Sequence, residues 1–168
     1  MKRQLEIQVQ SVLSCKKAMV DIVSLDGRVL ITVHSLLNLK AAGAKLSFAN
    51  LVEESLPGAD LARADLSGAD LSGAEFTGCT LNGANLAQVR APYADFCNVA
   101  AVESDWYSSN LVGADMRRAR LARASFHSCD LRGADLRGAD LRFADFRNCR
   151  LEDCRFENAE TSGAMFSS

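Results

Sequence analysis

The sequence predicts an all-β solenoid, in which the chain coils in short walls of five residues around an apolar core. Large apolar side chains recur at every fifth position from Leu46 to Phe166, where 14 Leu, 6 Phe, Met116 and Trp106 fill 22 of the 25 repeat centres. Small side chains, 16 Ala and 4 Cys, occupy the position two residues before a centre. Nine of the 11 glycines stand two residues after a centre, where a chain reversal favours them.

A period of five matches neither the helical period of 3.6 nor the strand period of 2. In one continuous strand Leu61 and Leu66 would point to opposite faces, so burying both requires a corner in every repeat. Each repeat is therefore predicted to form one wall. Its small residue and its Leu face inward, whereas the polar residue between them, such as Asp65 or Asn85, faces outward.

The bulkiest centres indicate how the walls alternate. All eight centres that are aromatic or Met lie on alternate repeats, at positions 76, 96, 106, 116, 126, 146, 156 and 166. The small centres Ala91 and Ala101 flank Phe96 and Trp106, which indicates volume compensation in a shared core. An even number of walls in each turn follows.

Segments such as Ala64-Asp65-Leu66-Ser67-Gly68 resemble the A(D/N)LxG pattern of the pentapeptide-repeat family, and the pattern continues from residue 44 to residue 168 without an insertion. The resemblance implies a right-handed quadrilateral β-helix with four repeats in each coil. The 125 repeat residues then give about six coils. At roughly 4.8 Å between stacked strands, the rod is expected to be about 30 Å long.

Residues 1–43 follow a different pattern, and we expect them to form an N-terminal cap on the β-helix of residues 44–168. Leu5, Ile7 and Val9 alternate with polar residues, as in a half-buried strand. A similar small β-rich leader occurs in pentapeptide-repeat proteins of bacterial and prophage origin.

The rest of this cap is expected to contain a hairpin and a short helix. The apolar runs 18–25 and 28–33 meet at Asp26-Gly27, a favourable turn between antiparallel strands. Ser35 is expected to begin a helix that continues through Ala42 and ends at Gly43.

The charge balance indicates no bulk polyanion or polycation, because the segments 1–43, 44–110 and 111–168 carry net charges of +3, −6 and +1. The first residues lack the apolar stretch of a signal peptide or membrane span, so we expect a cytoplasmic protein with no membrane association. Its six cysteines include no CxxC pair and are expected to be reduced thiols.

Motifs for catalysis are missing from the sequence. It contains no nucleophile elbow, Walker loop, GxGxxG, HExxH or CxxC motif, so we expect no enzyme, no cofactor and no metal site. His34 and His127 are expected to be solvated polar residues. Cysteines at small inward positions are expected to serve packing: Cys79, Cys129, Cys149 and Cys154. Cys97 is expected to face outward.

Two surface patterns are candidates for an interaction site. With 20 residues in a coil, Glu75, Asp95, Asp115 and Asp135 stack in one acidic column, which is either neutralised by its neighbours or kept for a cationic partner. Arg117 and Arg137, two residues after Asp115 and Asp135, can neutralise the C-terminal half of this column, whereas Glu75 and Asp95 have no such partner. The C-terminal coils carry arginines on every wall, and those at Arg132, Arg137 and Arg142 are candidate contacts. They form either an Arg/Asp lattice that holds the coils in register or a nucleic-acid site. The lattice is favoured because no exposed aromatic residues interleave with them.

The C-terminal end of the repeat is a third candidate surface. Phe156, Met165 and Phe166 are expected on or near an end without a lid. Either the last coil frays, or two solenoids form a homodimer by end-to-end contact.

The favoured function is a non-catalytic scaffold that presents a rigid solenoid surface to another protein. The family resemblance implies an alternative, because some pentapeptide-repeat proteins mimic duplex DNA, bind bacterial type II topoisomerases such as gyrase and protect them from inhibitors. Glu75 and Asp95 are compatible with this alternative. The arginine-bearing coils depart from it, as does the missing helical module through which those relatives dimerise.

Overall fold

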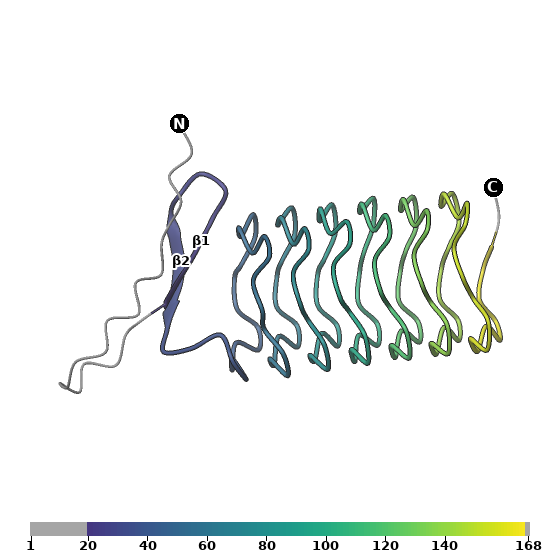
Figure 1. Ribbon diagram of the computed structural model, residues 1–168, viewed down its shortest axis with the longest axis horizontal. Helices are drawn as coiled ribbons and strands as arrows, with labels where there is room; N and C mark the ends of the chain where they lie inside the picture. Colours follow the sequence, from purple (N-terminus) through teal and green to yellow (C-terminus); the bar gives the residue numbers. More distant parts are fainter. Residues whose placement is uncertain (1–19, 167–168) are drawn as a thin grey trace.

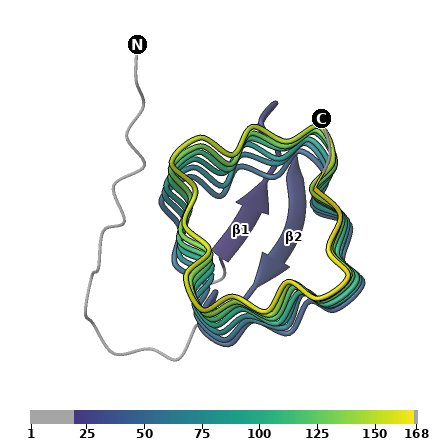
Figure 2. The same ribbon diagram turned by 90° about the vertical axis from the view of Figure 1, so that its right-hand side faces the viewer.

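The computed structural model describes residues 20–166, which form a rod of stacked coils with a hairpin at its N-terminal end (Figure 1). Seen along the rod, the coils superimpose as a quadrilateral (Figure 2). Parallel bridges join residues 20 positions apart, as from Lys45 to Asp65 and from Asp65 to Asn85. Four repeats therefore make one coil, as the sequence pattern and the resemblance together predicted.

We name the four sides of the quadrilateral by their repeat centres. Wall A is centred on every twentieth residue from 46 to 166, wall B on those from 51 to 151, wall C on those from 56 to 156, and wall D on those from 61 to 161. The bulky centres all lie on walls A and C. Because these walls are separated by walls B and D, aromatic side chains enter the core from opposite sides, as the alternation of centres indicated.

Each wall ends in a tight turn two residues after its centre. The carbonyl of Leu46 accepts a hydrogen bond from the amide of Ala49 at 3.0 Å, and Phe48 between them has a φ of 58°. Positive φ recurs at this position in every repeat from Phe48 to Gly163, as a turn of type II requires. Glycine adopts it at least cost, which explains the glycine pattern, yet 16 other residues also adopt positive φ.

The backbone between corners bonds to the coils on either side. The amide of Leu46 donates to the carbonyl of Asp65 at 2.7 Å, and the amide of Asp65 donates to the carbonyl of Ala44 at 2.9 Å. This pattern repeats along the rod, so main-chain polar groups of the inner coils are satisfied without long strands.

The interior is filled by the repeat centres and the small residues. All centres from 46 to 146 are at most 1% exposed. On wall A, the ring of Phe126 stacks on Trp106 and Phe146 with centroids 5.8 and 4.9 Å away. Ser104 replaces the usual alanine beside Trp106, and its hydroxyl accepts the indole N–H at 2.7 Å while donating to the Ala101 carbonyl. The exception in the small-residue pattern thus satisfies a buried donor.

Strands β1 (Val20–Val23) and β2 (Val29–Val33) form an antiparallel hairpin, as the apolar runs predicted. The hairpin lies across the N-terminal end of the first coil (Figure 2). Ile22 is buried there, and the amide of Leu25 donates to the carbonyl of Phe48 at 2.7 Å. The strand expected around residues 5–9 lies outside the described residues.

The helix expected from Ser35 to Ala42 is wrong, because this segment belongs to the first coil. Lys40 bridges to Asp60, and both Leu39 and Ala41 are buried against the core. Ser35 caps no helix; its hydroxyl accepts the amide of Leu37, two residues later, at 3.1 Å. Pairing with the second coil satisfies the backbone that a helix would have bonded internally. None of residues 20–166 forms a helix that could cross a membrane.

Candidate interaction surfaces

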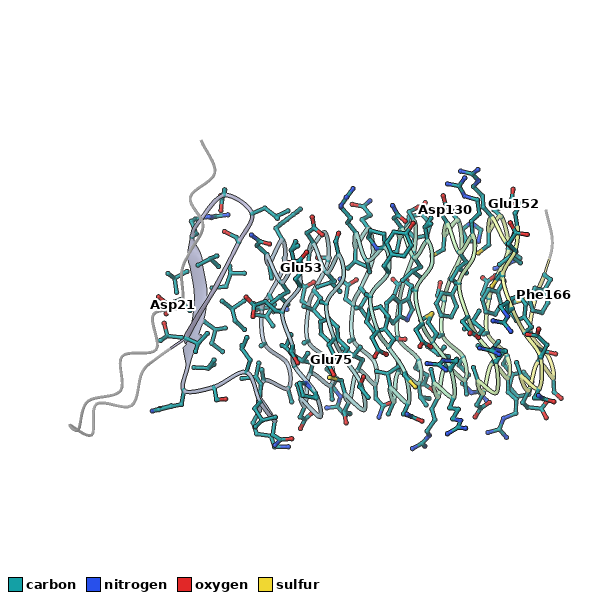
Figure 3. All side chains as sticks on the ribbon, viewed as in Figure 1. Asp21, Glu53, Glu75, Asp130, Glu152 and Phe166 are labelled. Atoms are coloured by element: carbon teal, nitrogen blue, oxygen red, sulfur yellow. The ribbon has the colours of Figure 1, made fainter. Side chains whose placement is uncertain are left out.

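The acidic column lies on wall C as the sequence predicted. Bridges join Glu75 to Asp95, Asp95 to Asp115, and Asp115 to Asp135, so the four carboxylates project from successive coils. Glu75 is exposed and lies in the N-terminal half of the rod (Figure 3). The column continues into Arg155, which bridges to Asp135.

The C-terminal half of this column, Asp115 and Asp135, is paired with arginines. Arg117 pairs with Asp115, and Arg137 pairs with Asp135, each at 2.6 Å. Hydrogen bonds from Arg137 lower the pKa of Asp135. Burial alone would raise the pKa of Asp115, and the hydrogen bonds and charge of Arg117 more than offset that effect.

Glu75 and Asp95 form the N-terminal half of the column. Within residues 20–166, these two carboxylates accept hydrogen bonds only from uncharged groups. The hydroxyl of Ser55 donates to Glu75, and that of Thr77 donates to Asp95 at 3.0 Å. The amide of Cys97 donates to the second oxygen of Asp95 at 2.7 Å. Glu75 and Asp95 therefore keep their negative charge open to a cationic group.

Most arginines of the C-terminal coils form the Arg/Asp lattice. In each of five Asp-x-Arg segments the guanidinium pairs with the carboxylate two residues before it, across 2.6 to 2.8 Å: Arg117, Arg132, Arg137, Arg142 and Arg147. Arg150 adds a pair between coils with Asp130 at 3.3 Å. The candidate contacts Arg132, Arg137 and Arg142 are thus held by carboxylates of their own walls.

Four arginines make no ion pair within the described residues: Arg63, Arg118, Arg120 and Arg123. Sequence reasoning grouped three of them with the lattice arginines. None of the four has an Asp two residues before it, but this signal is only partial, because Arg90 and Arg150 also lack such an Asp and pair with Asp70 and Asp130 of the preceding coil. Arg120 even occupies the outward position that holds Asp60 and Asp140 elsewhere on wall D.

A shallow hollow of about 480 Å³ lies beside the acidic column. Its lining includes Cys97, Arg117, Arg118, Arg137 and Glu157. Burial raises the pKa of the Cys97 thiol, and Asp115 and Asp95 raise it further. The outward thiol is therefore kept protonated at neutral pH rather than activated.

The inward cysteines pack as expected. The thiols of Cys79, Cys129 and Cys149 donate to backbone carbonyls at 2.8 to 2.9 Å. Burial raises the pKa of Cys79 to about 11 and that of Cys154 to about 12. These thiols fill the space that alanine fills elsewhere.

The histidines lie on the surface or partly exposed. His34 is exposed after β2. His127 stacks on Tyr107 with ring centroids 5.8 Å apart, and a ring nitrogen lies 3.2 Å from the amide nitrogen of Asn148. Within residues 20–166, no group of three His, Cys, Asp or Glu side chains is arranged to hold a metal ion.

The three residues expected at the C-terminal end lie in the last described coil. Phe166 is 48% exposed and Met165 is 44% exposed, and Figure 3 shows Phe166 at the end of the rod. Phe156 is half-buried, and its ring meets that of Phe166 edge to face. The last described coil therefore exposes apolar side chains.

These features define a repeat solenoid with a filled core, whose polar side chains form flat outer walls. The family model of pentapeptide repeats matches residues 42–78, 107–138 and 134–168 with eight copies, which is more than half of the chain. The chain therefore belongs to the pentapeptide-repeat family, whose solved members form right-handed quadrilateral β-helices. No curated protein matches it.

Solved structures of the family resemble the chain at modest identity. A pentapeptide-repeat protein from the thylakoid lumen of Arabidopsis thaliana is 28% identical, with a TM-score of 0.47, over 64% of this chain and 70% of that one. HetL, involved in heterocyst differentiation regulation in the cyanobacterium Nostoc, is 24% identical, with a TM-score of 0.25, over 77% and 81%. QnrB1, a plasmid-mediated fluoroquinolone resistance protein, is 23% identical, with a TM-score of 0.32, over 77% and 90%.

Proposed function

We propose that the protein is a non-catalytic scaffold that binds another protein through the outer walls of its solenoid. The observation that carries this proposal is the uninterrupted coil, in which inward side chains are consumed by packing and outward ones form four regular walls. Such a surface is fixed before binding, so little conformational entropy is lost when a partner docks. Family membership is consistent with a role in binding.

A capture experiment tests the scaffold role. The tagged full chain is incubated with extract of the cells that encode it, cross-linked, and its partners are identified by mass spectrometry. We expect one protein to be retained in near-stoichiometric amount and to bind again when both proteins are purified. A reproducible hydrolytic or transferase activity that is lost on substitution of one exposed residue would contradict the proposal.

A second candidate function is binding to a bacterial type II topoisomerase as a mimic of DNA. It is favoured by Glu75 and Asp95, because their carboxylates are stacked on adjacent coils and lack an arginine partner among the described residues. On the following two coils, Arg117 and Arg137 neutralise the carboxylates of the column, so the acidic surface is shorter than the row of phosphates in a DNA strand.

A gyrase supercoiling assay separates the two candidates. If the protein is a DNA mimic, it inhibits supercoiling or protects the enzyme from a quinolone, and the variant Glu75→Gln/Asp95→Asn loses the effect. An unchanged assay at a molar excess of protein removes this candidate and leaves the scaffold proposal intact.

For the C-terminal end we propose a second copy of the chain as the occupant. Phe156 and Phe166 are apolar. The backbone groups on the C-terminal side of this coil can form with the second copy the same hydrogen bonds that join the inner coils to one another. Light scattering should show a dimer that the variant Phe166→Asp makes monomeric. A wild-type monomer at all concentrations would contradict this contact.

A further inference from the structure

Three of the four arginines that make no ion pair within residues 20–166 gather around one wall. Arg118 stands at the corner between walls C and D, Arg120 projects from wall D, and Arg123 stands at the corner between walls D and A. All three side chains are exposed, and they span one full side of the same coil. Three cations in a row on one wall repel each other unless an anion lies between them.

Nothing in the coil itself neutralises these three groups. The nearest carboxylate of wall D, Asp140, already binds Arg142 through both of its oxygens at 2.8 Å. Arg120 stands where the preceding coil carries Ala100, and Asp140 occupies the same position in the following coil. Arg123 lies over the ring of Phe143, with its guanidinium carbon 5.3 Å from the centroid, which orients the cation without cancelling its charge.

The floor next to the arginines is uncharged and built of small side chains. Ala100 bridges to Arg120 from the preceding coil, and Thr80 bridges to Ala100. Val102 and Ala122, one residue past their centres, are partly exposed on the same wall. A neutral, partly apolar centre with charged groups at its edge is the usual composition of a protein interface.

Two hollows in the surface of wall D also fit an extended peptide segment. A hollow of about 410 Å³ is lined by Arg63, Asn82, Val102, Glu103 and Arg120, with Gly83 completing it. Among the described residues that line this hollow, two arginines outnumber the single carboxylate of Glu103, so the hollow carries a net positive charge. An adjoining hollow of about 420 Å³ is lined by Ala42, Gly43, Ala62, Arg63 and Asn82 and extends it along the rod.

From these observations we infer that wall D, with the cluster Arg118, Arg120 and Arg123 at one end, is the docking surface for an acidic, extended protein segment. The inference rests on the scaffold function and names its surface and the chemistry of its partner. Carboxylates of the segment pair with the arginines, and its small apolar side chains lie over Ala100 and Val102. An extended segment of about six residues is long enough to reach from Asn82 to Arg120 and to the corners that carry Arg118 and Arg123.

A nucleic acid fits this wall less well. Its phosphates would need many cations, whereas wall D and its corners offer four arginines that make no ion pair within residues 20–166, on a chain whose net charge is −2. The apolar floor matches side chains of a peptide rather than a sugar–phosphate backbone. Short duplex DNA therefore serves as a competing probe in the binding experiment.

The probe is a fluorescently labelled peptide of about seven residues in which Glu alternates with Val, titrated with the full chain at low ionic strength and followed by anisotropy. We expect saturable binding that weakens with salt, and amide chemical-shift changes confined to wall D residues such as Ala100, Val102 and Ala122. The variant Arg118→Gln/Arg120→Gln/Arg123→Gln should weaken binding about tenfold.

The matched control is Arg132→Gln/Arg137→Gln/Arg147→Gln, which removes the same charge from walls A, B and C. We expect less than a twofold change, provided that circular dichroism shows both variants folded. Absence of peptide binding by the wild type, equal loss in both variants, or tighter binding of short duplex DNA through the same arginines would overturn the inference. If a captured protein still binds the first variant, wall D is excluded while the scaffold function stands.

Discussion

The two halves of the solenoid share one backbone and stabilise it differently. Residues 44–110 carry a net charge of −6, and wall A there is centred on leucines as far as Leu86. Residues 111–168 carry +1, and their wall A centres are phenylalanines that stack from coil to coil. All five Asp-x-Arg pairs also lie in this second half.

This difference shows that one backbone accepts different residues in its core and different arrangements of charge on its surface. The core needs only matched volume within each layer, so Trp106 and Phe96 are compensated by alanines on the adjoining walls. The surface tolerates different arrangements of charge. Five carboxylates of the C-terminal half pair with arginines of their own walls, whereas Glu75 and Asp95 of the N-terminal half accept hydrogen bonds only from uncharged groups within residues 20–166.

The largest expected effect tests the aromatic half against the leucine half. Phe126→Ala should cost about 4 kcal/mol, and Leu66→Ala, at the equivalent position of wall A, about 3 kcal/mol. The excess arises because Phe126 loses stacking on both Trp106 and Phe146 as well as its burial. Urea unfolding followed by far-ultraviolet circular dichroism measures both. An equal or smaller cost at Phe126 would show that the ring stack adds nothing.

The next largest effect concerns Ser104, which lies beside Trp106, the first aromatic centre of wall A. Ser104→Ala leaves the buried indole N–H of Trp106 without its acceptor and should cost about 2 kcal/mol. In the double variant Ser104→Ala/Trp106→Phe, the cost should be less than the sum of the two single costs. Additive costs in this urea-unfolding cycle would mean that the hydrogen bond is not stabilising.

A smaller effect compares two corners of the N-terminal half. Gly68 and Gly78 both have a φ of 67°, but a Cβ on Gly68 would lie 2.6 Å from the ring of Phe48, whereas nothing lies within 4 Å at Gly78. Gly68→Ala should therefore be about 1 kcal/mol more destabilising than Gly78→Ala, since both carry the same backbone strain. Thermal unfolding of the pair, with Phe48→Ala/Gly68→Ala as the control, should restore near equality.

The smallest effect concerns the ion pairs of the C-terminal half. Hydrogen bonds from the neighbouring arginines lower the pKa of four carboxyl groups: Asp130, Asp135, Asp140 and Asp145. A depressed folded-state pKa gives stability that is present above the unfolded value of about 3.9 and is lost as the pH falls through the folded value. Each exposed pair should contribute at most about 1 kcal/mol.

Melting temperatures between neutral pH and pH about 3 measure this contribution. The variant with Asn at all four positions should be less stable at neutral pH and should lose less stability on acidification than the wild type. Parallel curves for the two proteins would show that the lattice does not stabilise the folded state.

Much of the architecture was predictable from the sequence. The wall, its corner and its inward residues follow from the five-residue period alone, because every Leu must reach the same core. The segment at residues 35–42 was not predicted, because Leu39 stands where the repeat has a small residue and Ala41 where it has a large one. That inversion hid the first coil, and its pairing with the second coil overrode the helical signal.

The candidate surfaces were predicted only in part. Stacking of Glu75 over Asp95 followed from a spacing of 20, and so did the position of Arg120 on wall D. The pairing of Arg117 with Asp115 also followed from their spacing of two residues. A spacing of 20 does not show why Arg150 pairs with Asp130 while Arg120 makes no ion pair with Asp140. The five-residue period by itself determined which side chains point in or out. Only the stacked coils decided which charges of neighbouring coils meet, because a guanidinium pairs where carboxylate oxygens lie within about 3 Å, and that distance depends on how the coils stack.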